Sequence, residues 1–328
     1  PFADPLVEAM NRALKEKKQI ILFQNRRGYS PQIECRTCGW VPHCKHCDVS
    51  LTLHKNANKL VCHYCGYTIP APVHCPNCEG RNFSTLGYGT EKIEDDLQNL
   101  FPEARIKRMD LDTTRTRTAY EKIIGDFQDG KTDILIGTQM VSKGLDFDNV
   151  DVVGIVNADT LLNYPDFRAT ERAFQLMSQV AGRAGRKNGQ GNVFLQTKMT
   201  DAPVIPQIVS NDYTAFYNQQ LQERMLFHYP PFYRLIYIYM KHRDVRVIEE
   251  FSELIGHRMR EIFDNRILGP DLPPVAKVKQ LYIRKIVLKV ENGLSQYKVN
   301  EVLRNIQQAY CEQPRYRSIV MYYDIDPL

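Results

Sequence analysis

Eight of the nine cysteines lie between Cys35 and Cys78, where they form four Cys-x-x-Cys pairs. The pairs are Cys35/Cys38, Cys44/Cys47, Cys62/Cys65 and Cys75/Cys78. A Cys-x-x-Cys turn directs two thiolates toward one point, and two such turns complete a tetrahedral four-cysteine shell around zinc. Four turns therefore predict two structural zinc sites, because no coordination position is left open for a reacting water. The alternative, which this spacing disfavours, is a set of core thiols or redox-active pairs.

The four pairs can combine into two sites in three ways. The segment between Cys47 and Cys62 is only slightly shorter than a common zinc-ribbon loop, which favours a nested arrangement. The inner site is then Cys44/Cys47/Cys62/Cys65, and the outer site is Cys35/Cys38/Cys75/Cys78. Four nearby histidines are not needed to complete two shells, so we expect them beside the sites or at the surface: His43, His46, His63 and His74. The ninth cysteine, Cys311, is expected in a hydrophobic core.

A second segment with recognisable chemistry is Gln179-Val-Ala-Gly182-Arg183-Ala-Gly185-Arg186. Two arginines three positions apart on a helix point in nearly the same direction, and the glycines allow another backbone to approach closely. Arginine binds phosphate through paired hydrogen bonds and stabilises charge during phosphoryl transfer. The segment therefore predicts a phosphate-binding site, and the alternative is an ordinary basic helix end at the surface.

A third segment, from Gly137-Thr138-Gln139 to Lys143-Gly144-Leu145-Asp146, directly follows an apolar run that fits a buried parallel strand. Loops at the carboxyl ends of parallel strands are where α/β sheets bind their ligands. This position predicts a ligand-binding loop, although polar connections containing glycine also occur without a ligand.

The elements that position these residues alternate between apolar runs and amphipathic segments. Strands are expected at 19–24, 83–88, 104–109, 133–137, 151–157 and 191–196. Helices are expected from Asp4 as N-cap onward, at 90–100, from a Thr118-x-x-Glu121 capping box to Gly130, and at 168–181. This alternation predicts a parallel sheet with right-handed crossovers. The cysteine block, with an expected hairpin of 49–54 and 59–63, interrupts the alternation and is therefore an insertion.

Near residue 205 the pattern changes. Strands are expected at 235–240, 278–290 and 318–324, and helices from Tyr213 and at 246–263 and 295–310. This order predicts a small α+β domain resembling a split βαβ unit. Its basic stretch, 277–289, either contacts branched DNA or a partner, or is a solvated strand face. The expected segments are thus 1–30 (lobe), 31–82 (cysteine-rich insertion), 83–204 (rest of the lobe) and 205–328 (α+β domain).

The composition is that of an ordinary globular protein, with 43% hydrophobic and 25% charged residues among 328. No apolar run approaches the ~18–20 residues that cross a membrane. The formal net charge of +5 falls close to neutral if eight thiolates bind two zinc ions, so nucleic-acid binding must rest on local basic patches. Paired cysteines without a secretory signal indicate the reducing cytoplasm. The chain begins without Met, and we expect it to be part of a longer protein.

The arginine segment and the loop before it together resemble motifs VI and V of superfamily 2 helicases, in the second RecA-like lobe. The resemblance narrows to the primosomal protein N′ (PriA) family of bacterial replication-restart DNA helicases, whose cysteine-rich region is inserted in lobe 2. The segments that carry it are Asn25-Arg-Arg-Gly-Tyr29, Gly87-Tyr-Gly-Thr-Glu91, Asp110-x-Asp112-Thr-Thr, Tyr164-Pro-Asp-Phe-Arg168, Tyr229-Pro-Pro-Phe232, Leu268-Gly-Pro270 and Asp324-Ile-Asp-Pro-Leu328. One departure is Val278-Lys279-Gln280, where the family pattern would place a turn with glycine.

The resemblance implies roles for individual residues. It implies that Gln179, Arg183 and Arg186 reach the ATP phosphates across a cleft between two lobes. It implies that Gly144 and Asp146 couple the nucleotide to the lobe interface. It further implies DNA contacts for Thr138, Gln139 and Lys143 in the loop, and for Arg26 and Arg27 at the edge of the lobe.

As a whole the resemblance implies the carboxyl-terminal part of an ATP-dependent 3′→5′ DNA helicase, nucleoid-associated in bacteria, that recognises stalled or branched forks and initiates primosome assembly. Its partners would be single-stranded and forked DNA, single-strand DNA-binding protein and other primosome proteins, without a membrane. ATP and Mg²⁺ would bind with the family's first lobe, so we expect no phosphate loop within these residues and no activity of this part alone. The alternatives are a non-enzymatic zinc adaptor on an inactive helicase-like scaffold, or a different superfamily 2 helicase.

Overall fold

The computed structural model describes residues 2–24, 32–54, 58–86, 89–110, 113–138, 147–164, 166–184 and 191–327. The chain forms two compact units, each built from two separate stretches of sequence. The first unit combines residues 1–30 with 87–220, and the second combines residues 31–86 with 221–328. The cysteine-rich insertion therefore forms one unit with the carboxyl-terminal region, an association that the sequence did not predict.

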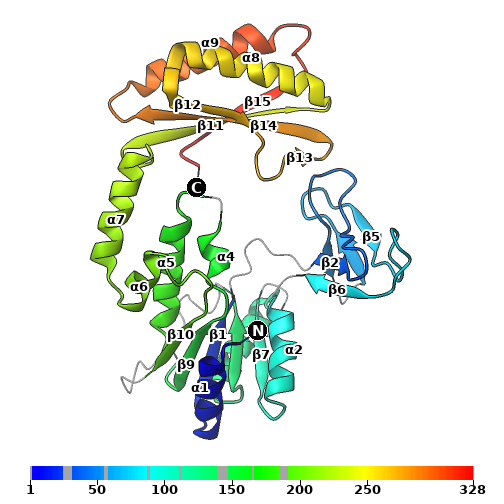
Figure 1. Ribbon diagram of the computed structural model, residues 1–328, viewed down its shortest axis with the longest axis vertical. Coiled ribbons are helices and arrows are strands. Elements are labelled where there is room, and N and C mark those ends of the chain that lie inside the picture. Colours follow the sequence, from blue (N-terminus) through cyan, green and yellow to red (C-terminus); the bar gives the residue numbers. More distant parts are fainter. Residues whose placement is uncertain are drawn as a thin grey trace. The chain divides into compact units, whose positions relative to one another are not determined.

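The first unit, called the lobe below, is built on a five-stranded sheet with the order β10-β9-β1-β8-β7 (Figure 1). All neighbouring strands are parallel, as the alternation of elements predicted. The strands are β1 Gln19–Phe23, β7 Ile106–Met109, β8 Ile134–Gly137, β9 Val150–Ile155 and β10 Asn192–Leu195. β1 and β8 are buried throughout, which explains why their sequences are continuous apolar runs rather than alternating ones.

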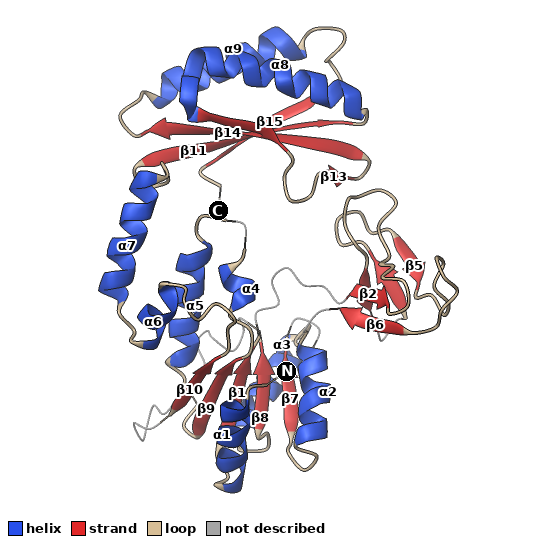
Figure 2. Cartoon of the chain, in the orientation of Figure 1, coloured by secondary structure: helices blue, strands red, loops and turns tan. Residues whose placement is uncertain are grey.

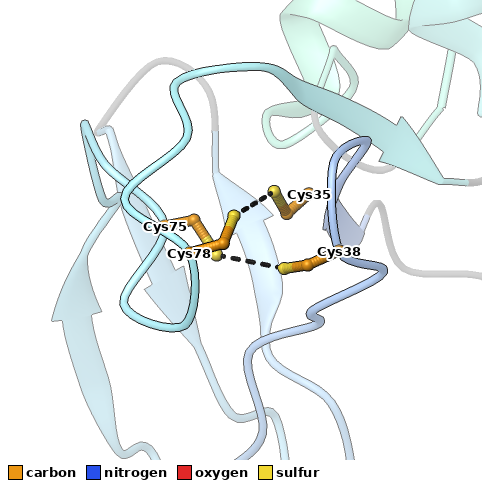
Figure 3. Close-up of side chains that lie close together, drawn as sticks. All are labelled: Cys35, Cys38, Cys75 and Cys78. Atoms are coloured by element: carbon orange, nitrogen blue, oxygen red, sulfur yellow. Dashed lines mark hydrogen bonds between the residues drawn. The ribbon is translucent and has the colours of Figure 1, made fainter.

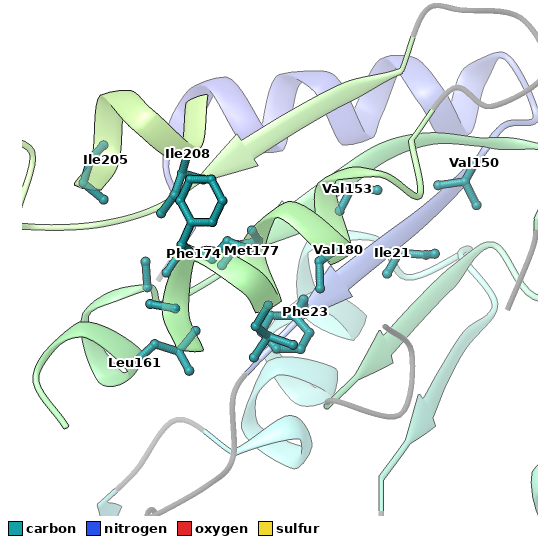
Figure 4. Close-up of a cluster of buried hydrophobic side chains, with 14 of the residues drawn as sticks. Ile21, Phe23, Val150, Val153, Leu161, Phe174, Met177, Val180, Ile205 and Ile208 are labelled. Carbon is teal, nitrogen blue, oxygen red and sulfur yellow. The ribbon is translucent and has the colours of Figure 1, made fainter. Parts of the chain in front are cut away.

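Helices cover both faces of this sheet and create two hydrophobic cores. They are α1 Asp4–Lys15, α2 Thr90–Leu100, α3 Arg117–Gln128, α4 Asp159–Leu162, α5 Ala169–Ala181, α6 Val204–Val209 and α7 Tyr213–Leu226. Successive side chains of β1 alternate between the two cores. Ile20 and Leu22 pack with α1 and α2 on one face. Ile21 and Phe23 point to the opposite face, where they join side chains of α3 and α5 (Figure 4).

Two expected helix starts and one strand differ from the structure. The N-cap of α1 is Ala3, with Asp4 in the first turn, and the N-cap of α3 is Thr116, whose hydroxyl accepts from the Ala119 amide at 3.2 Å. The prediction of a capping box at Thr118 is therefore wrong, because Thr116 caps the helix two residues earlier by accepting a hydrogen bond from a first-turn amide. The strand expected at 83–88 forms as β6 Phe83–Leu86, but it pairs with β2 Gln32–Cys35 and not with the lobe sheet.

The cysteine-rich insertion, called the cysteine module below, contains short antiparallel strands. Besides the β2–β6 pair, β3 Thr52–His54, β4 Lys59–Val61 and β5 Thr68–Pro70 form a three-stranded sheet. The expected hairpin is thus confirmed, with β5 added. Apart from three cysteines, the fully buried members of its core are only Ile33, Leu51 and Leu60.

The carboxyl-terminal domain is a five-stranded antiparallel sheet, covered on one face by two helices (Figure 2). Four strands follow the order β12-β14-β11-β15, and the short β13 pairs with β14. Its elements are β11 Tyr233–His242, α8 Val245–Phe263, the 3-10 turn η3 Asp264–Arg266, β12 Ile267–Asp271, β13 Lys277–Val278, β14 Leu281–Glu291, α9 Gln296–Cys311 and β15 Val320–Ile325. The α+β prediction is confirmed. The sequence reading missed β12, because Gly269 and Pro270 interrupt its apolar pattern. With β12 the order becomes the βαββαβ arrangement of the split βαβ class.

Within the described parts of the chain, no helix combines the length and the apolar character that a membrane span requires.

Candidate functional site

The outer cysteine cluster joins the two ends of the cysteine module. Cys35 ends β2, Cys38 follows in the next turn, and Cys75 and Cys78 come from the last loop of the module (Figure 3). The sulfur atoms of Cys35 and Cys78 lie 3.5 Å apart, and those of Cys38 and Cys75 lie 3.6 Å apart.

The inner cluster consists of Cys44, Cys47, Cys62 and Cys65 and lies beside the small core of the module. The sulfur atoms of Cys44 and Cys65 lie 3.6 Å apart, and the backbone N–H of His46 donates to Cys44 Sγ at 3.3 Å. Burial raises the pKa of the Cys44 thiol and raises the pKa of Cys47 to about 12. In the absence of metal these groups are thiols at neutral pH, so a metal must displace their protons when it binds.

Both clusters fit a tetrahedral zinc ion. In each, the four sulfur atoms lie within 4.8 Å of one another. A zinc–sulfur bond of about 2.3 Å places tetrahedral sulfurs about 3.8 Å apart, close to the shortest separations in both clusters. The structure thus brings the eight cysteines together in the nested arrangement that the loop length favoured.

Three of the four Cys-x-x-Cys turns have the same local structure. In each, the residue after the second cysteine donates its N–H to the carbonyl of the first cysteine at 2.8 Å, and the donors are Gly39, Gly66 and Glu79. All three adopt positive φ angles of 72°, 79° and 59°. Glycine adopts this conformation without steric cost, so the glycines at 39 and 66 help these turns to form.

The histidines near the clusters are not part of the metal-binding groups found among the described residues. His74 Nε2 lies 2.7 Å from the Nε of Arg81, and His46 contacts Gln280. These contacts agree with the expected positions beside the sites. Cys311 packs against the core of the carboxyl-terminal domain, where burial raises the pKa of its thiol.

The arginine segment begins on α5 Ala169–Ala181, which ends where the helix at 168–181 was expected to end and before Arg183. The helix ends at Ala181 with Gly182 as its C-cap, and Arg183 lies in the tighter turn that follows, its N–H donating to Val180 at 3.0 Å. The prediction that both arginines lie on a helix is wrong for Arg183, because glycine is a poor helix former and ends α5 here. The Arg183 side chain is 9% exposed, whereas Gln179 is exposed. Arg186 lies outside the described residues.

The loop for which ligand binding is predicted begins at Thr138, directly after β8. Its amide donates weakly to the carbonyl of Met109 at 3.4 Å, which places Thr138 beside the end of β7. The other residues expected in this loop and at the edge of the lobe lie outside the described parts of the chain: Gln139, Lys143, Gly144, Asp146, Arg26 and Arg27. Since all five strands are parallel, the chain leaves β1 and β8 at the same edge of the sheet.

The spacing of a phosphate loop, G-x-x-x-x-G-K-T, does occur at Gly125–Thr132, contrary to our expectation from the sequence. A phosphate loop runs from a strand to a helix and directs backbone amides at the phosphates. Here the order is reversed, because the segment ends α3 and leads into β8. The amides of Gly130 and Lys131 donate to the carbonyls of Phe127 and Asp126. These donors are used by the helix end, so the segment is not a phosphate loop.

A buried carboxylate at the end of β7 was not singled out from the sequence, where Asp110 was only part of a family motif. Asp110 is fully buried, and its Oδ2 accepts from the Thr90 hydroxyl at 2.5 Å and lies 3.3 Å from Arg108 Nη1. Its Oδ1 accepts from the Thr113 amide at 3.0 Å. A buried charge of this kind requires such partners, and the network fixes α2 to the carboxyl edge of the sheet. The available signal was a polar residue directly after a buried strand.

The basic stretch 277–289 divides between two faces of the carboxyl-terminal sheet. Arg284 points toward α8 and pairs with Glu249 at 2.6 Å. Lys285 lies on the helix-free face, in register with Tyr239 of β11, which is in turn in register with Tyr322 of β15. The rings of Tyr239 and Tyr322 stack with centroids 5.2 Å apart.

Lysines interleave with the tyrosines on this helix-free face. The ammonium group of Lys285 lies 4.6 Å from the ring centroid of Tyr237, and that of Lys241 lies 4.6 Å from the ring of Tyr322. Lys289 has a different role, since it donates to the carbonyl of Phe227 at 2.7 Å and burial lowers its pKa. The face therefore combines stacked aromatic rings with positive charge.

Known protein families match the cysteine module, the lobe and the carboxyl-terminal domain. Three family models match successive segments of the chain: the Cys-rich region domain of PriA DNA helicase at 44–70, the helicase conserved C-terminal domain at 81–188, and the primosomal protein N C-terminal domain at 225–328. A parallel-sheet lobe that carries a zinc-ribbon insertion and matches the helicase C-terminal domain defines the class as a helicase second lobe.

Relatives along the whole chain identify the family. Replication restart protein PriA of Bacillus subtilis is 38% identical over 328 residues, which are 99% of this chain and 40% of the relative. The protein of the same name from Haemophilus influenzae is 38% identical over 330 residues, 99% of this chain and 44% of the relative. The chain belongs to the PriA family of replication restart proteins, and it spans about two fifths of the length of these relatives.

Two solved helicase structures align with part of the chain. Domain 2 of the DEAD-box helicase Mss116p, bound to an RNA duplex, aligns with 62% of this chain and 52% of its own, at 14% identity and a TM-score of 0.32. The Hef helicase domain of Pyrococcus furiosus aligns with 60% of this chain and 26% of its own, at 17% identity and a TM-score of 0.29.

Proposed function

We propose that this chain is the second motor lobe, cysteine module and carboxyl-terminal domain of an ATP-dependent 3′→5′ DNA helicase that restarts replication at stalled or branched forks. The observation that carries the proposal is the insertion of two four-cysteine clusters into a helicase-type parallel-sheet lobe. The whole enzyme would act on the chromosome in the bacterial cytoplasm and nucleoid. It would meet single-strand DNA-binding protein and other primosome proteins there.

In this proposal the two clusters each hold one structural zinc ion. Zinc supplies a fixed tetrahedral centre that a module with so small a core needs in order to fold. The eight cysteines are all used as ligands, so no position remains for a reacting water. The cysteine module therefore shapes a surface for DNA or protein rather than performing chemistry.

The ATP chemistry would be shared with a first lobe. Gln179, Arg183 and Arg186 would face the phosphates and stabilise the charge that develops during hydrolysis. Gly144 and Asp146 would couple the nucleotide to the interface between lobes, and closure of the cleft would move the lobes along DNA. Mg²⁺ and ATP would be held by the phosphate loop of the first lobe, since the one match to that pattern in this chain is a helix end.

The DNA would be contacted at two places. Thr138 directly follows β8 at the carboxyl edge of the lobe. The backbone of the translocated strand would be bound by this residue together with Gln139, Lys143, Arg26 and Arg27. The second place is the helix-free face of the carboxyl-terminal sheet. Stacked tyrosines offer planar surfaces to unpaired bases, and Lys241 and Lys285 can contact phosphates.

Arginine substitutions in the full-length protein test the ATP proposal. Arg186→Ala should abolish DNA-stimulated ATP hydrolysis, with a loss of 10³-fold or more, while nucleotide binding changes little. Arg172→Ala is the matched control, because Arg172 lies on α5, is exposed and pairs with Asp166. Loss of nucleotide binding without a hydrolysis defect would contradict the assignment. The 328 residues alone should hydrolyse no ATP at any DNA concentration.

The same assays separate the rival functions. A zinc adaptor on an inactive scaffold would show no DNA-stimulated ATP hydrolysis in the full-length protein. A different superfamily 2 helicase, such as one acting on RNA, would be stimulated by duplex RNA more than by forked DNA. Two zinc ions per chain are expected by metal analysis, and a content far from two would remove the structural-zinc proposal.

The DNA-binding face is tested with single-stranded DNA and fluorescence anisotropy. Tyr322→Ala should weaken binding by about 1–3 kcal/mol, because a stacked base loses its partner. Lys285→Ala should lower the salt dependence of binding by about one counterion. Lys298→Ala is the charge-matched control, because Lys298 is exposed on α9, which covers the other face. Equal effects of Lys285→Ala and Lys298→Ala would mean that binding follows net charge and not this face.

A further inference from the structure

A turn of the carboxyl-terminal domain contacts the inner cysteine cluster directly. The turn joins β13 to β14, and its two central residues are Lys279 and Gln280. The backbone N–H of Lys279 donates to Cys47 Sγ at 3.3 Å, although the two residues are separated by 232 positions in the sequence. Both segments belong to the same compact unit of the structure.

The other three cysteine turns are closed by their own residues. In each, the residue after the second cysteine donates its N–H to the carbonyl of the first cysteine, and the donors are Gly39, Gly66 and Glu79. Cys44 Sγ also accepts a hydrogen bond from within its own turn, from the backbone N–H of His46 at 3.3 Å. Backbone amides that donate to a thiolate lower the energy of its negative charge and fix its direction. The bond from Lys279 has this effect on Cys47, but it comes from outside the module.

The fourth turn, Cys44 to Cys47, is not closed by a hydrogen bond between its own residues. The amide of Asp48, which would close the turn on the Cys44 carbonyl, donates instead to the carbonyl of Lys277 at 2.9 Å. Asp48 also lacks the positive φ angle found at Gly39, Gly66 and Glu79. The distant turn thus accepts the hydrogen bond of the amide that closes the other cysteine turns, and it donates a hydrogen bond to the second sulfur of this one.

Further contacts hold this turn against the cluster. The amide of Gln280 donates to the carbonyl of His46 at 2.8 Å, and the Gln280 side-chain nitrogen lies 3.1 Å from His46 Nδ1. Val278 packs against the core of the cysteine module. The turn therefore contacts the module through backbone hydrogen bonds, a polar side chain and an apolar side chain.

The backbone conformation of the turn also indicates that it depends on contacts from outside the turn. Lys279 and Gln280 have φ angles of 50° and 65°, the left-handed values of a two-residue hairpin turn that favours Asn-Gly. Neither residue adopts these angles readily by itself. This explains the departure from the family pattern noted in the sequence, since a turn with outside contacts does not depend on glycine to form.

We propose that the 277–280 turn is part of the inner metal site, where it completes the fourth cysteine turn and so ties the carboxyl-terminal domain to the cysteine module through the metal. The outer site needs no residue from outside the module. The inference rests on the two metal sites proposed above. It predicts that the two metals of one chain differ in how firmly they are held, and that only the inner one responds to changes in the turn.

The unaltered chain provides the first test. After the zinc is exchanged for ¹¹³Cd, the inner metal should show scalar coupling to the Lys279 amide proton through the sulfur of Cys47. The amide of His46 serves as the internal reference, because it donates to Cys44 Sγ within the module. Coupling to His46 without coupling to Lys279, together with fast hydrogen exchange of the Lys279 amide, would overturn the proposal.

A substitution provides the second test. Val278→Asp places a charge against the module core, and Val320→Asp makes the same change at a valine that is 53% exposed on the edge strand of the same domain. With excess chelator, Val278→Asp should accelerate the release of one metal about ten- to a hundredfold and leave the other unchanged. Val320→Asp should release both at the parent rates. Equal acceleration of both metals, or none, by Val278→Asp would contradict the proposal.

The outcomes separate this inference from the metal sites themselves. A chain that binds no zinc fails the proposed function before the turn is considered. A chain that binds two metals of equal lability, unaffected by Val278→Asp, retains the metal sites and loses only the role of the turn. If Val278→Asp does not fold, the cadmium coupling in the unaltered chain still decides.

Discussion

The lobe and the cysteine module are stabilised in different ways, although one chain passes from the first into the second and back. The lobe has two hydrophobic cores on the two faces of a parallel sheet, and β1 is buried along its whole length. Among the described residues of the module, the buried apolar cluster consists of Ile33, Leu51 and Leu60 together with three cysteines. A core of that size does not offset the conformational entropy of the module, so metal coordination must supply the difference.

This contrast agrees with the proposed function. In that proposal, the lobe would keep its strands fixed while loops at the carboxyl edge respond to nucleotide, and dense apolar packing provides that rigidity. The module must present a particular surface from a short segment, which metal centres achieve with few residues. The inner cluster adds a connection to the carboxyl-terminal domain that apolar packing in the module could not provide alone.

Metal removal should break the contrast most strongly. A chelator that strips both zinc ions removes a binding free energy of about 10–16 kcal/mol for a structural site, and the module should lose its fold. Hydrogen exchange should then show loss of protection in β3, β4 and β5 and full protection in β1 and β8. Persistent protection of the module without metal would show that its core is sufficient.

The reverse experiment is Phe23→Ala, which removes a fully buried ring from the lobe. The loss of apolar contact and the cavity left behind should lower the free energy of unfolding by about 3–5 kcal/mol, measured by urea denaturation. Zinc content should remain unchanged. Leu100→Ala, at a position that is 47% exposed, should cost about 0.5 kcal/mol or less. A loss of zinc from Phe23→Ala would mean that the two regions are stabilised together.

A pair of glycine substitutions sharpens the description of packing in the lobe. A Cβ at Gly154 in β9 would lie 2.6 Å from Leu22 Cδ2 and 3.2 Å from Leu6 Cδ1, so Gly154→Ala should destabilise by about 1–3 kcal/mol. A Cβ at Gly125 in α3 meets nothing within 4 Å, so Gly125→Ala should stabilise by about 0.5–1 kcal/mol. Thermal unfolding of both variants measures the difference. Equal melting temperatures would show that the side chains around Gly154 can move to make room for the added methyl group.

The smallest expected effect comes from an ion pair of the lobe. Arg105 donates two hydrogen bonds to Asp133 and lowers its pKa, so the pair stabilises the fold above the ordinary aspartate pKa of about 3.9. Because Arg105 is 56% exposed, Asp133→Asn should cost about 0.5 kcal/mol at pH 7. The difference from the parent should disappear as the pH falls below the lowered pKa, whereas acid should strip metal from the module. A constant difference down to pH 2 would contradict the ion-pair explanation.

Much of the fold was readable because its signals are local. Apolar runs located the strands of the lobe, and the cysteine spacing located the module and favoured the nested clusters. The misread elements have local causes as well: Thr116 caps α3 in place of Thr118, and Gly269 with Pro270 concealed β12. The partner of β6 was misassigned because a strand sequence does not state which sheet it joins.

The candidate site was predictable to different degrees. Cysteine ligands need only their own spacing, so all eight were found. Arg183 was found by motif, but its burial and its position beyond the end of α5 depend on how Gly182 ends the helix. The match to a phosphate loop at Gly125–Thr132 shows the opposite case, in which spacing is present and the surrounding elements rule the function out.

The sequence by itself determined the two metal clusters, the parallel sheet of the lobe and the family, because thiolate spacing and apolar periodicity act over a few residues. Only the tertiary structure decided what lies next to those clusters. Lys279 and Cys47 are 232 positions apart, and no local pattern links a hairpin turn without glycine to an incomplete cysteine turn. Their contact depends on how the carboxyl-terminal domain packs against the cysteine module. That packing is what makes the inner metal site different from the outer one.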